Sequence, residues 1–126
     1  MTELIDLAGQ RCLVVAAEEP CLRTVREVTD LVGDAMGEGA VVIAVQVSAL
    51  DPSFFDLRSG FAGELLQKAA NYGRKFAIVG DVSAHTAASK AFHDLVVESA
   101  HSHGYFFVPD LDALAARLTR LEAKAG

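Results

Sequence analysis

The chain has 126 residues, of which 52% are hydrophobic and 22% charged, and this composition is typical of a single globular domain spanning residues 1–126. Its net charge of −6, without any cluster of Lys and Arg, argues against nucleic acid and anionic membranes as partners. No apolar run approaches the roughly 20 residues that span a bilayer, and the start MTELIDLAGQ lacks a basic export signal. Cys12 and Cys21 are too few for a disulfide framework. We therefore expect a cytoplasmic protein.

Strand and helix patterns alternate along the chain. Residues 5–16 are typical of a β-hairpin, because Gly9 at the first position of the two-residue loop Gly9-Gln10 suits a type II′ turn. Apolar residues at helical spacing, glycine stops and β-branched runs then predict further elements. These are helices over 22–36, 60–72, 86–100 and 111–123, and strands over 41–47, 76–80 and 105–108.

The resulting order, ββαβαβαβα, predicts an α/β sandwich with a mainly parallel sheet and the first strand antiparallel at one edge. Ligands and partners meet such sheets at the loops that follow the carboxyl ends of the strands. Here those loops contain Glu18-Glu19, residues 48–59, residues 81–86 and Asp110. We therefore expect the functional side chains in these loops.

Ser59 directly precedes Gly60 at the start of the helix 60–72. A hydroxyl there can cap free backbone N–H groups, which is a purely structural role. The same position suits a regulatory phosphorylation site or an anion held at the helix N-terminus. Asp56 has the same two interpretations, because it can cap the turn DPSFFD or orient a group that approaches Ser59.

Asp81 ends a buried strand, and Ser83, His85 and Thr86 follow it. Asp81, Ser83 and Thr86 can bind a cation or another ligand, or they can simply hold the start of the next helix. A phosphorelay receiver site would also need an aspartate after the strand 41–47 and a lysine near Pro109, and the sequence has neither.

Other catalytic and metal-binding patterns are missing from the sequence. Asp81, Ser83 and His85 lie too close along one loop to predict a catalytic triad, and no GxSxG, Walker or GxGxxG pattern occurs. His101 and His103 lack the carboxylate or thiolate that would complete a zinc site, so we expect solvated histidines. The sequence therefore predicts no metal and no cofactor.

The helix 60–72 is a candidate surface for a protein partner. Its polar residues lie next to two adjacent aromatic residues in the preceding loop, and such a combination is typical of interaction patches. Alternatively, at least one of the aromatic rings belongs to the core. The candidate residues are Phe54, Phe55, Glu64, Gln67, Lys68 and Asn71, and we expect an ion pair between Glu64 and Lys68.

The segment FFDLRSG, followed by a helix, a glycine stop and KFAIVGD, resembles the sulfate-transporter and anti-sigma-antagonist (STAS) domain. This resemblance implies an N-terminal hairpin followed by alternating helices and strands. In the anti-sigma antagonists a partner kinase phosphorylates the last serine of an Asp-Ser-Ser-Gly turn. By position, Ser59 would be the phosphoacceptor and Asp56 the aspartate, although this loop has one extra residue and Leu57-Arg58 replace the first serine.

The same stretch is more similar to a bacterial family known as domain of unknown function 4180, to which no activity is attached. The matching residues are Phe54-Phe55-Asp56-Leu57, Gly60, Ala62-Gly63-Glu64, Leu66-Gln67-Lys68, Asn71-Tyr72, Lys75, Ala77-Ile78 and Gly80-Asp81, with Phe106-Phe107-Val108 near the end.

The resemblances and the polar residues together lead to two expectations. The first is a non-catalytic, STAS-like regulatory module that binds a protein, with phosphorylation at Ser59 as its switch and a homodimer as one possible assembly. The alternative is an enzyme or small-ligand-binding protein with a polar site at the carboxyl edge of the sheet. This second expectation uses Asp56, Ser59, Asp81, Ser83 and Thr86, and it requires a concave cavity that joins those side chains.

Overall fold

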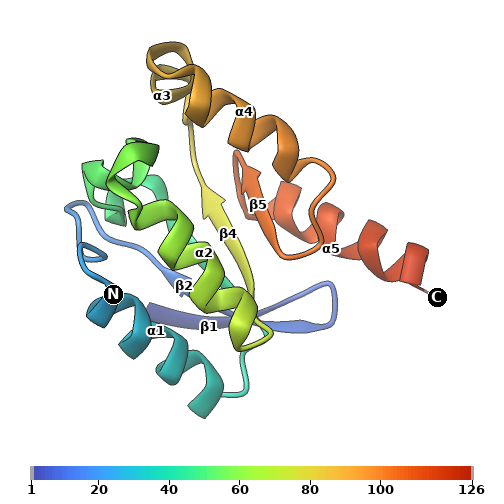
Figure 1. Ribbon diagram of the computed structural model, residues 1–126. Coiled ribbons are helices and arrows are strands. Elements are labelled where there is room, and N and C mark those ends of the chain that lie inside the picture. Colours follow the sequence, from blue (N-terminus) through green and yellow to red (C-terminus); the bar gives the residue numbers. More distant parts are fainter. Residues whose placement is uncertain (1, 126) are drawn as a thin grey trace.

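The computed structural model describes residues 2–125 as an α/β structure built on one mixed five-stranded sheet (Figure 1). The strands lie in the order β1-β2-β3-β4-β5; β1 pairs antiparallel with β2, and each later pair is parallel. The strands are β1 (Thr2–Leu7), β2 (Gln10–Val15), β3 (Val42–Gln46), β4 (Lys75–Val79) and β5 (Tyr105–Val108). The α-helices are α1 (Val25–Gly37), α2 (Phe61–Asn71), α3 (Ser83–Ala88), α4 (Lys90–Ser99) and α5 (Leu111–Ala125).

The β1–β2 turn differs from the sequence-based prediction by one residue. Leu7 pairs with Gln10, so the two central residues of the turn are Ala8 and Gly9. Their φ angles are both positive, 52° and 78°, as a type I′ turn requires. The type II′ turn predicted at Gly9-Gln10 was therefore wrong, although the hairpin itself is present.

Helices cover both faces of the sheet. Helices α1, α2 and α4 pack on one face, where Leu13 and Val15 of β2 contribute to the larger core. The opposite residues of the same strand, Cys12 and Val14, face the smaller core beneath α5. This arrangement follows from the order of the strands, because successive right-handed crossovers between adjacent parallel strands place their helices on the same side. Only α5, which follows the last strand, packs on the other side (Figure 1).

The helix predicted over residues 86–100 is instead two helices, α3 and α4. Ser89 lies between them in an extended conformation, with φ −141° and ψ 118°. Its hydroxyl accepts a hydrogen bond from the backbone N–H of Phe92 at 3.2 Å, which makes Ser89 the N-cap of α4. The periodicity of the apolar residues continues through the break, so it did not reveal the second helix start.

Residues 47–59 connect β3 to α2 through three short 3-10 turns, η1 (Val47–Ala49), η2 (Pro52–Phe55) and η3 (Leu57–Ser59). Phe54 and Phe55 point from η2 into the larger core. Their rings meet Phe92 of α4 edge-to-face, with centroids 6.4 and 5.4 Å away, and His85 of α3 stacks on Phe55 at 3.7 Å. This aromatic cluster fixes the loop and α3 to the rest of the molecule.

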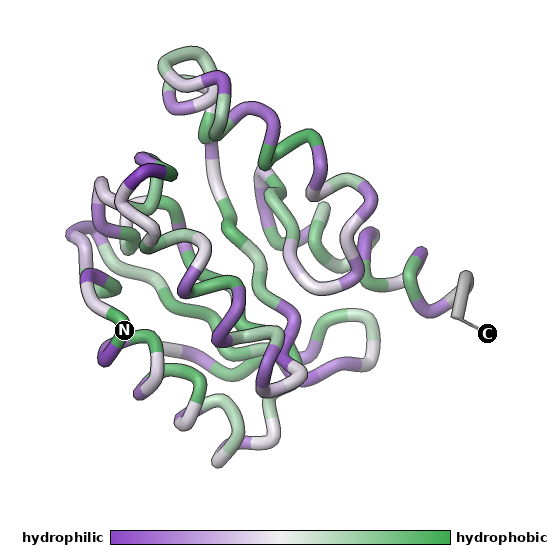
Figure 2. Tube along the Cα trace, in the orientation of Figure 1, coloured by the Kyte–Doolittle hydropathy of each residue, from purple (hydrophilic) through white to green (hydrophobic). Residues whose placement is uncertain are grey.

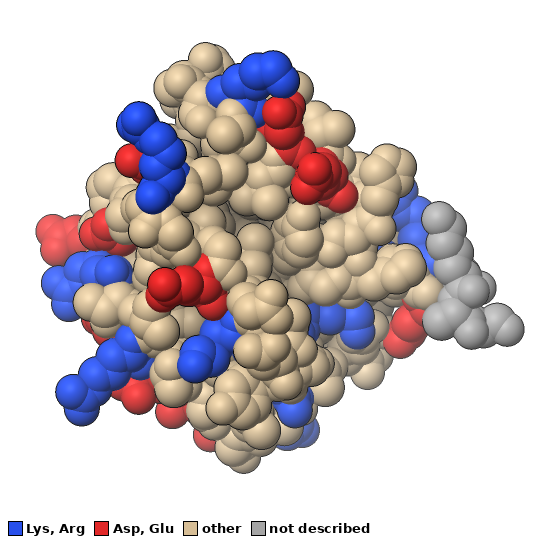
Figure 3. Space-filling model, viewed as in Figure 1, with Lys and Arg blue, Asp and Glu red and all other residues tan. Residues whose placement is uncertain are grey.

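The polar and apolar residues are distributed as this architecture requires. Figure 2 shows the hydrophobic colour concentrated along the strands, and hydrophilic residues along the outer sides of the helices. On the face shown in Figure 3, Lys and Arg side chains are interspersed with Asp and Glu. Among the described residues, no helix is long and apolar enough to cross a membrane.

Candidate functional site

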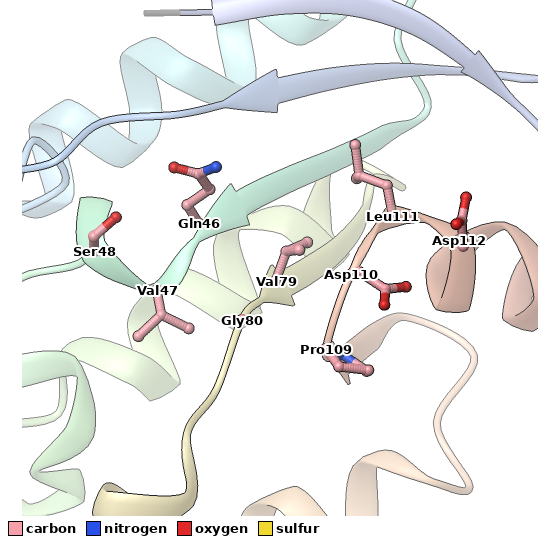
Figure 4. Close-up of a pocket in the computed structure, with 9 residues that line it drawn as sticks. All are labelled: Gln46, Val47, Ser48, Val79, Gly80, Pro109, Asp110, Leu111 and Asp112. Carbon is pink, nitrogen blue, oxygen red and sulfur yellow. The ribbon is translucent and has the colours of Figure 1, made fainter.

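A cavity of about 730 Å³ lies where the carboxyl ends of β3 and β4 meet the start of α5 (Figure 4). Three segments that are distant in the sequence form it, each at the end of a strand. Its lining residues are Gln46, Val47, Ser48, Val79, Gly80, Pro109, Asp110, Leu111 and Asp112. This is the edge at which α/β sheets bind their ligands.

The start of α5 is held at the cavity by Pro109 and Asp110. Pro109 follows β5 directly and has no N–H with which to continue the strand. The Oδ1 atom of Asp110 accepts a hydrogen bond from the backbone N–H of Ala113 at 2.8 Å, which caps the first turn of α5. This carboxylate therefore provides the acceptor for a free backbone N–H group of the first turn, and Asp110 remains one of the lining residues of the cavity.

Gly80 allows β4 to pass close to Val47 at the cavity wall. Its φ is +136°, a conformation that residues with a side chain rarely adopt. A Cβ added there would lie 3.0 Å from the Cγ2 atom of Val47. The backbone N–H of Gly80 donates to the carbonyl oxygen of Val108 at 2.9 Å and so joins β4 to the end of β5.

The polar side chains of the cavity are the amide of Gln46, the hydroxyl of Ser48, which donates to the carbonyl oxygen of Ala17, and the carboxylates of Asp110 and Asp112. In the view of Figure 4, the amide of Gln46 and the carboxylate of Asp110 lie on opposite sides of Val79. Within the described chain, no hydrogen bond or ion pair engages the side chains of Gln46 and Asp112, and no Lys or Arg lines the cavity. The arrangement therefore presents negative charge and open acceptor positions above apolar walls formed by Val79 and Leu111.

Asp56 and Ser59, two of the predicted site residues, act locally as caps in the structure. Asp56 accepts a hydrogen bond from the backbone N–H of Arg58 at 3.1 Å. The hydroxyl of Ser59 donates to the carbonyl oxygen of Ser53 at 2.6 Å and accepts from the backbone N–H of Phe61 at 3.2 Å. Both side chains are exposed at the start of α2, so the capping interpretation describes their contacts.

Asp81, Ser83 and Thr86 likewise hold the start of α3. The carboxylate of Asp81 accepts from the backbone N–H of Ser83 at 2.8 Å, and the hydroxyl of Thr86 donates to the carbonyl oxygen of Ser83 at 3.0 Å. The hydrogen bonds from Ser83 keep the pKa of Asp81 below its ordinary value, because they stabilise the charged form. Asp81 is therefore an exposed, ionised residue whose hydrogen bond with Ser83 precedes the first turn of α3.

The predicted site residues do not converge on the large cavity. Ser59 and Asp81 follow adjacent parallel strands, β3 and β4, but neither of them lines it. A smaller cavity of about 360 Å³ brings Asp56 beside Ala88 and Ser89, at the junction of α3 and α4. The large cavity does contain Ser48 and Asp110, which the sequence placed at this edge of the sheet. Gln46 and Asp112 were not selected, although Gln46 was recognisable as a polar residue near the end of an apolar strand.

The predicted partner surface needs a correction at its aromatic residues. Phe54 is fully buried and Phe55 is 9% exposed, so both rings belong to the core, because they fill the space between η2 and α4. The polar members of that surface, Glu64, Gln67, Lys68 and Asn71, lie along α2, and all except the half-buried Lys68 are exposed.

The ion pair predicted between Glu64 and Lys68 is absent from the ion pairs of the described residues. Instead, the side-chain amide of Gln67 donates to Asn71 at 2.8 Å on the same helix.

The structure contains neither a metal-binding cluster nor a disulfide in its described part. No group of three or more His, Cys, Asp or Glu among the described residues could hold a metal ion. Both cysteines are free, and burial raises the pKa of the Cys12 thiol from 9.0 to about 11. Cys12 is therefore a neutral core residue under ordinary conditions.

Comparison with known proteins places the chain in a family. No curated protein and no solved structure matches it. A family model described as "Domain of unknown function (DUF4180)" matches residues 7–118, which span β2 to β5 and the first half of α5. The chain therefore belongs to the DUF4180 family.

Proposed function

We propose that this protein binds a small molecule in the cavity at the carboxyl edge of its sheet, without catalysing a reaction. The observation that carries the proposal is the cavity of about 730 Å³ between the ends of β3 and β4 and the start of α5. The cavity is shallow and open to solvent, so it would hold a small ligand against one face, and its location follows the rule for ligand binding in open α/β sheets.

The side chains at the cavity define the chemical class of the ligand. Asp110 and Asp112 carry negative charge, Gln46 offers an amide, and Val79 and Leu111 offer apolar contact. A ligand that complements them has hydrogen-bond donors, namely hydroxyl or ammonium groups, on a small carbon skeleton. A phosphate or carboxylate group would be repelled by the two aspartates.

A thermal-shift screen with amine- and hydroxyl-bearing metabolites tests the proposal. We expect a compound of this class to raise the melting temperature of the wild-type protein, and Gln46→Ala and Asp112→Asn to reduce that effect. Both side chains are free of described contacts, so these variants should fold. Asp30→Asn, which removes a charge from the exposed side of α1, is the matched control and should respond like the wild type. The proposal fails if no such compound binds, or if every hit stabilises the site variants as strongly as the control.

A second candidate function is the STAS-like regulatory module, in which a kinase phosphorylates Ser59. The observation that favours it is the exposed hydroxyl of Ser59 at the start of α2, where the helix dipole stabilises an added phosphate. Phosphorylation would replace the hydrogen bond that Ser59 donates to Ser53 and so alter the surface formed by η3 and α2. A protein partner, a homodimer and a cytoplasmic location belong to this proposal.

Labelling with radioactive ATP in an extract of the native cells tests the switch without a known partner. We expect the wild-type protein and Ser83→Ala to become phosphorylated and Ser59→Ala to stay unlabelled. Equal labelling of Ser59→Ala would contradict the assignment, and so would the absence of label from all three proteins.

A further inference from the structure

A second polar cavity, of about 330 Å³, lies between the end of α4 and the outer part of α5. Its polar lining residues are His101, Ser102, His103, Arg117 and Arg120. The loop that carries the histidines precedes β5, whereas the cavity described above follows β5, so the two cavities lie at opposite ends of this strand. No carboxylate of the described residues lines the second cavity.

Arg117 is held rigidly at this cavity. Its Nη2 atom donates to the carbonyl oxygens of Ser99 and Ser102, at 2.6 and 3.1 Å. Its guanidinium lies over the ring of Phe106, 4.8 Å from the centroid, which is a cation–π arrangement. These contacts use one nitrogen and one face of the group, so the Nε and Nη1 donors have no acceptor among the described residues.

Arg120 adds a second positive charge at the same site. It lies three residues after Arg117 on α5, so the two side chains share one side of the helix. Among the described residues, no hydrogen bond or ion pair engages Arg120. Burial, and then repulsion by Arg120, lower the pKa of Arg117.

The loop 101–104 contributes more donors. The hydroxyl oxygen of Ser102 accepts hydrogen bonds from the backbone N–H groups of Gly104 and Tyr105, at 3.0 and 3.1 Å, so its own proton is available to a ligand. His101 and His103 flank this hydroxyl. They belong to no group of described residues that could hold a metal ion. Their imidazole N–H groups can instead donate hydrogen bonds to a ligand in the cavity.

We propose that this second cavity binds a small phosphorylated ligand. Guanidinium groups match the geometry of phosphate oxygens, and the hydroxyl and imidazole N–H groups provide further donors. A cavity of this size admits a ligand comparable to pyrophosphate. An anion between Arg117 and Arg120 would also relieve the repulsion between the two cations. This site is independent of the proposed function, because the first cavity selects the opposite charge.

Isothermal titration calorimetry with inorganic pyrophosphate, at constant ionic strength set by sodium chloride, tests the proposal. We expect saturable binding that Arg120→Gln weakens at least tenfold and Arg120→Lys weakens less. Arg120 has no described contact to lose, so both variants should fold. Arg26→Gln removes the same charge from the exposed side of α1 and should bind like the wild type. In ¹⁵N spectra, the shifted amides should include Ser102, Gly104 and Arg120.

Three results would overturn the proposal. The first is an absence of saturable pyrophosphate binding, and the second is binding that Arg120→Gln leaves unchanged. The third is a phosphoserine peptide that binds at least tenfold more tightly than pyrophosphate, which would assign the site to a protein partner instead.

Discussion

Single residues decide the shape of the carboxyl edge. At the wall of the cavity beside β4, Gly80 adopts a φ of +136°, and a Cβ at this position would lie 3.0 Å from Val47. The capping side chains of the neighbouring loops, Ser59 and Asp81, are used for backbone hydrogen bonds. Residues such as these stabilise the fold, whereas other residues keep hydrogen-bond donors or acceptors that no described residue contacts.

Gly80→Ala should destabilise the protein by about 2–3 kcal/mol, because alanine is strained at this φ and its Cβ meets Val47. Urea unfolding measures the change. Gly63→Ala is the matched control, because Gly63 lies in α2 with open space around the new Cβ, and it should stabilise by about 0.5–1 kcal/mol. Equal stability of Gly80→Ala and wild type would show that the backbone conformation is wrong.

Cys12 should make the stability of the protein fall at high pH. Burial raises its folded-state pKa from 9.0 to about 11, so the stabilisation is complete below pH 9 and is lost as the pH rises through 11. The loss approaches about 2–3 kcal/mol, since each pKa unit corresponds to about 1.4 kcal/mol. Urea unfolding between pH 8 and 11 measures it against Cys12→Ala, which lacks this ionisation. Parallel pH profiles of the two proteins would contradict the burial of the thiol.

At the scale of helices and strands, the apolar pattern predicted some elements at their observed positions and missed one break. The continuous β-branched run of β3 and the helical periodicity of α2 both predicted these elements where the structure has them. The pattern missed the break at Ser89, because Ala88 before it and Phe92 and Leu95 after it keep the same helical spacing. The break depends on one hydrogen bond and on the packing of Phe92 against the loop 47–59, which only the tertiary structure reveals.

Ser89→Ala should destabilise the protein by about 1 kcal/mol, because the N–H of Phe92 loses its cap. Ser89→Asp restores an acceptor at the helix N-terminus and should stay within about 0.5 kcal/mol of the wild type. Thermal unfolding compares the three proteins. A fully stable Ser89→Ala variant would mean that α3 and α4 form one continuous helix in solution.

At the scale of the whole molecule, the two faces of the sheet explain why the predicted site residues and the cavity differ. Ser59 and Asp81 begin helices that pack on the larger core, and their side chains serve those helix starts. The cavity is walled by Val79 and Leu111, which belong to the smaller core under α5. The sequence indicates which residues follow each strand, but it does not indicate which face α5 covers. The sequence therefore placed Ser48 and Asp110 at this edge, but it could not predict that Gln46 and Gly80 join them in one cavity.

The most direct test of ligand binding at the carboxyl edge is a ¹⁵N chemical-shift map with the best amine or hydroxyl compound from the thermal screen. We predict that the largest shifts fall on the amides of Gln46, Ser48, Gly80, Leu111 and Asp112. Shifts centred instead on Ser102, Gly104 and Arg120, or on the exposed side of α2, would contradict the account.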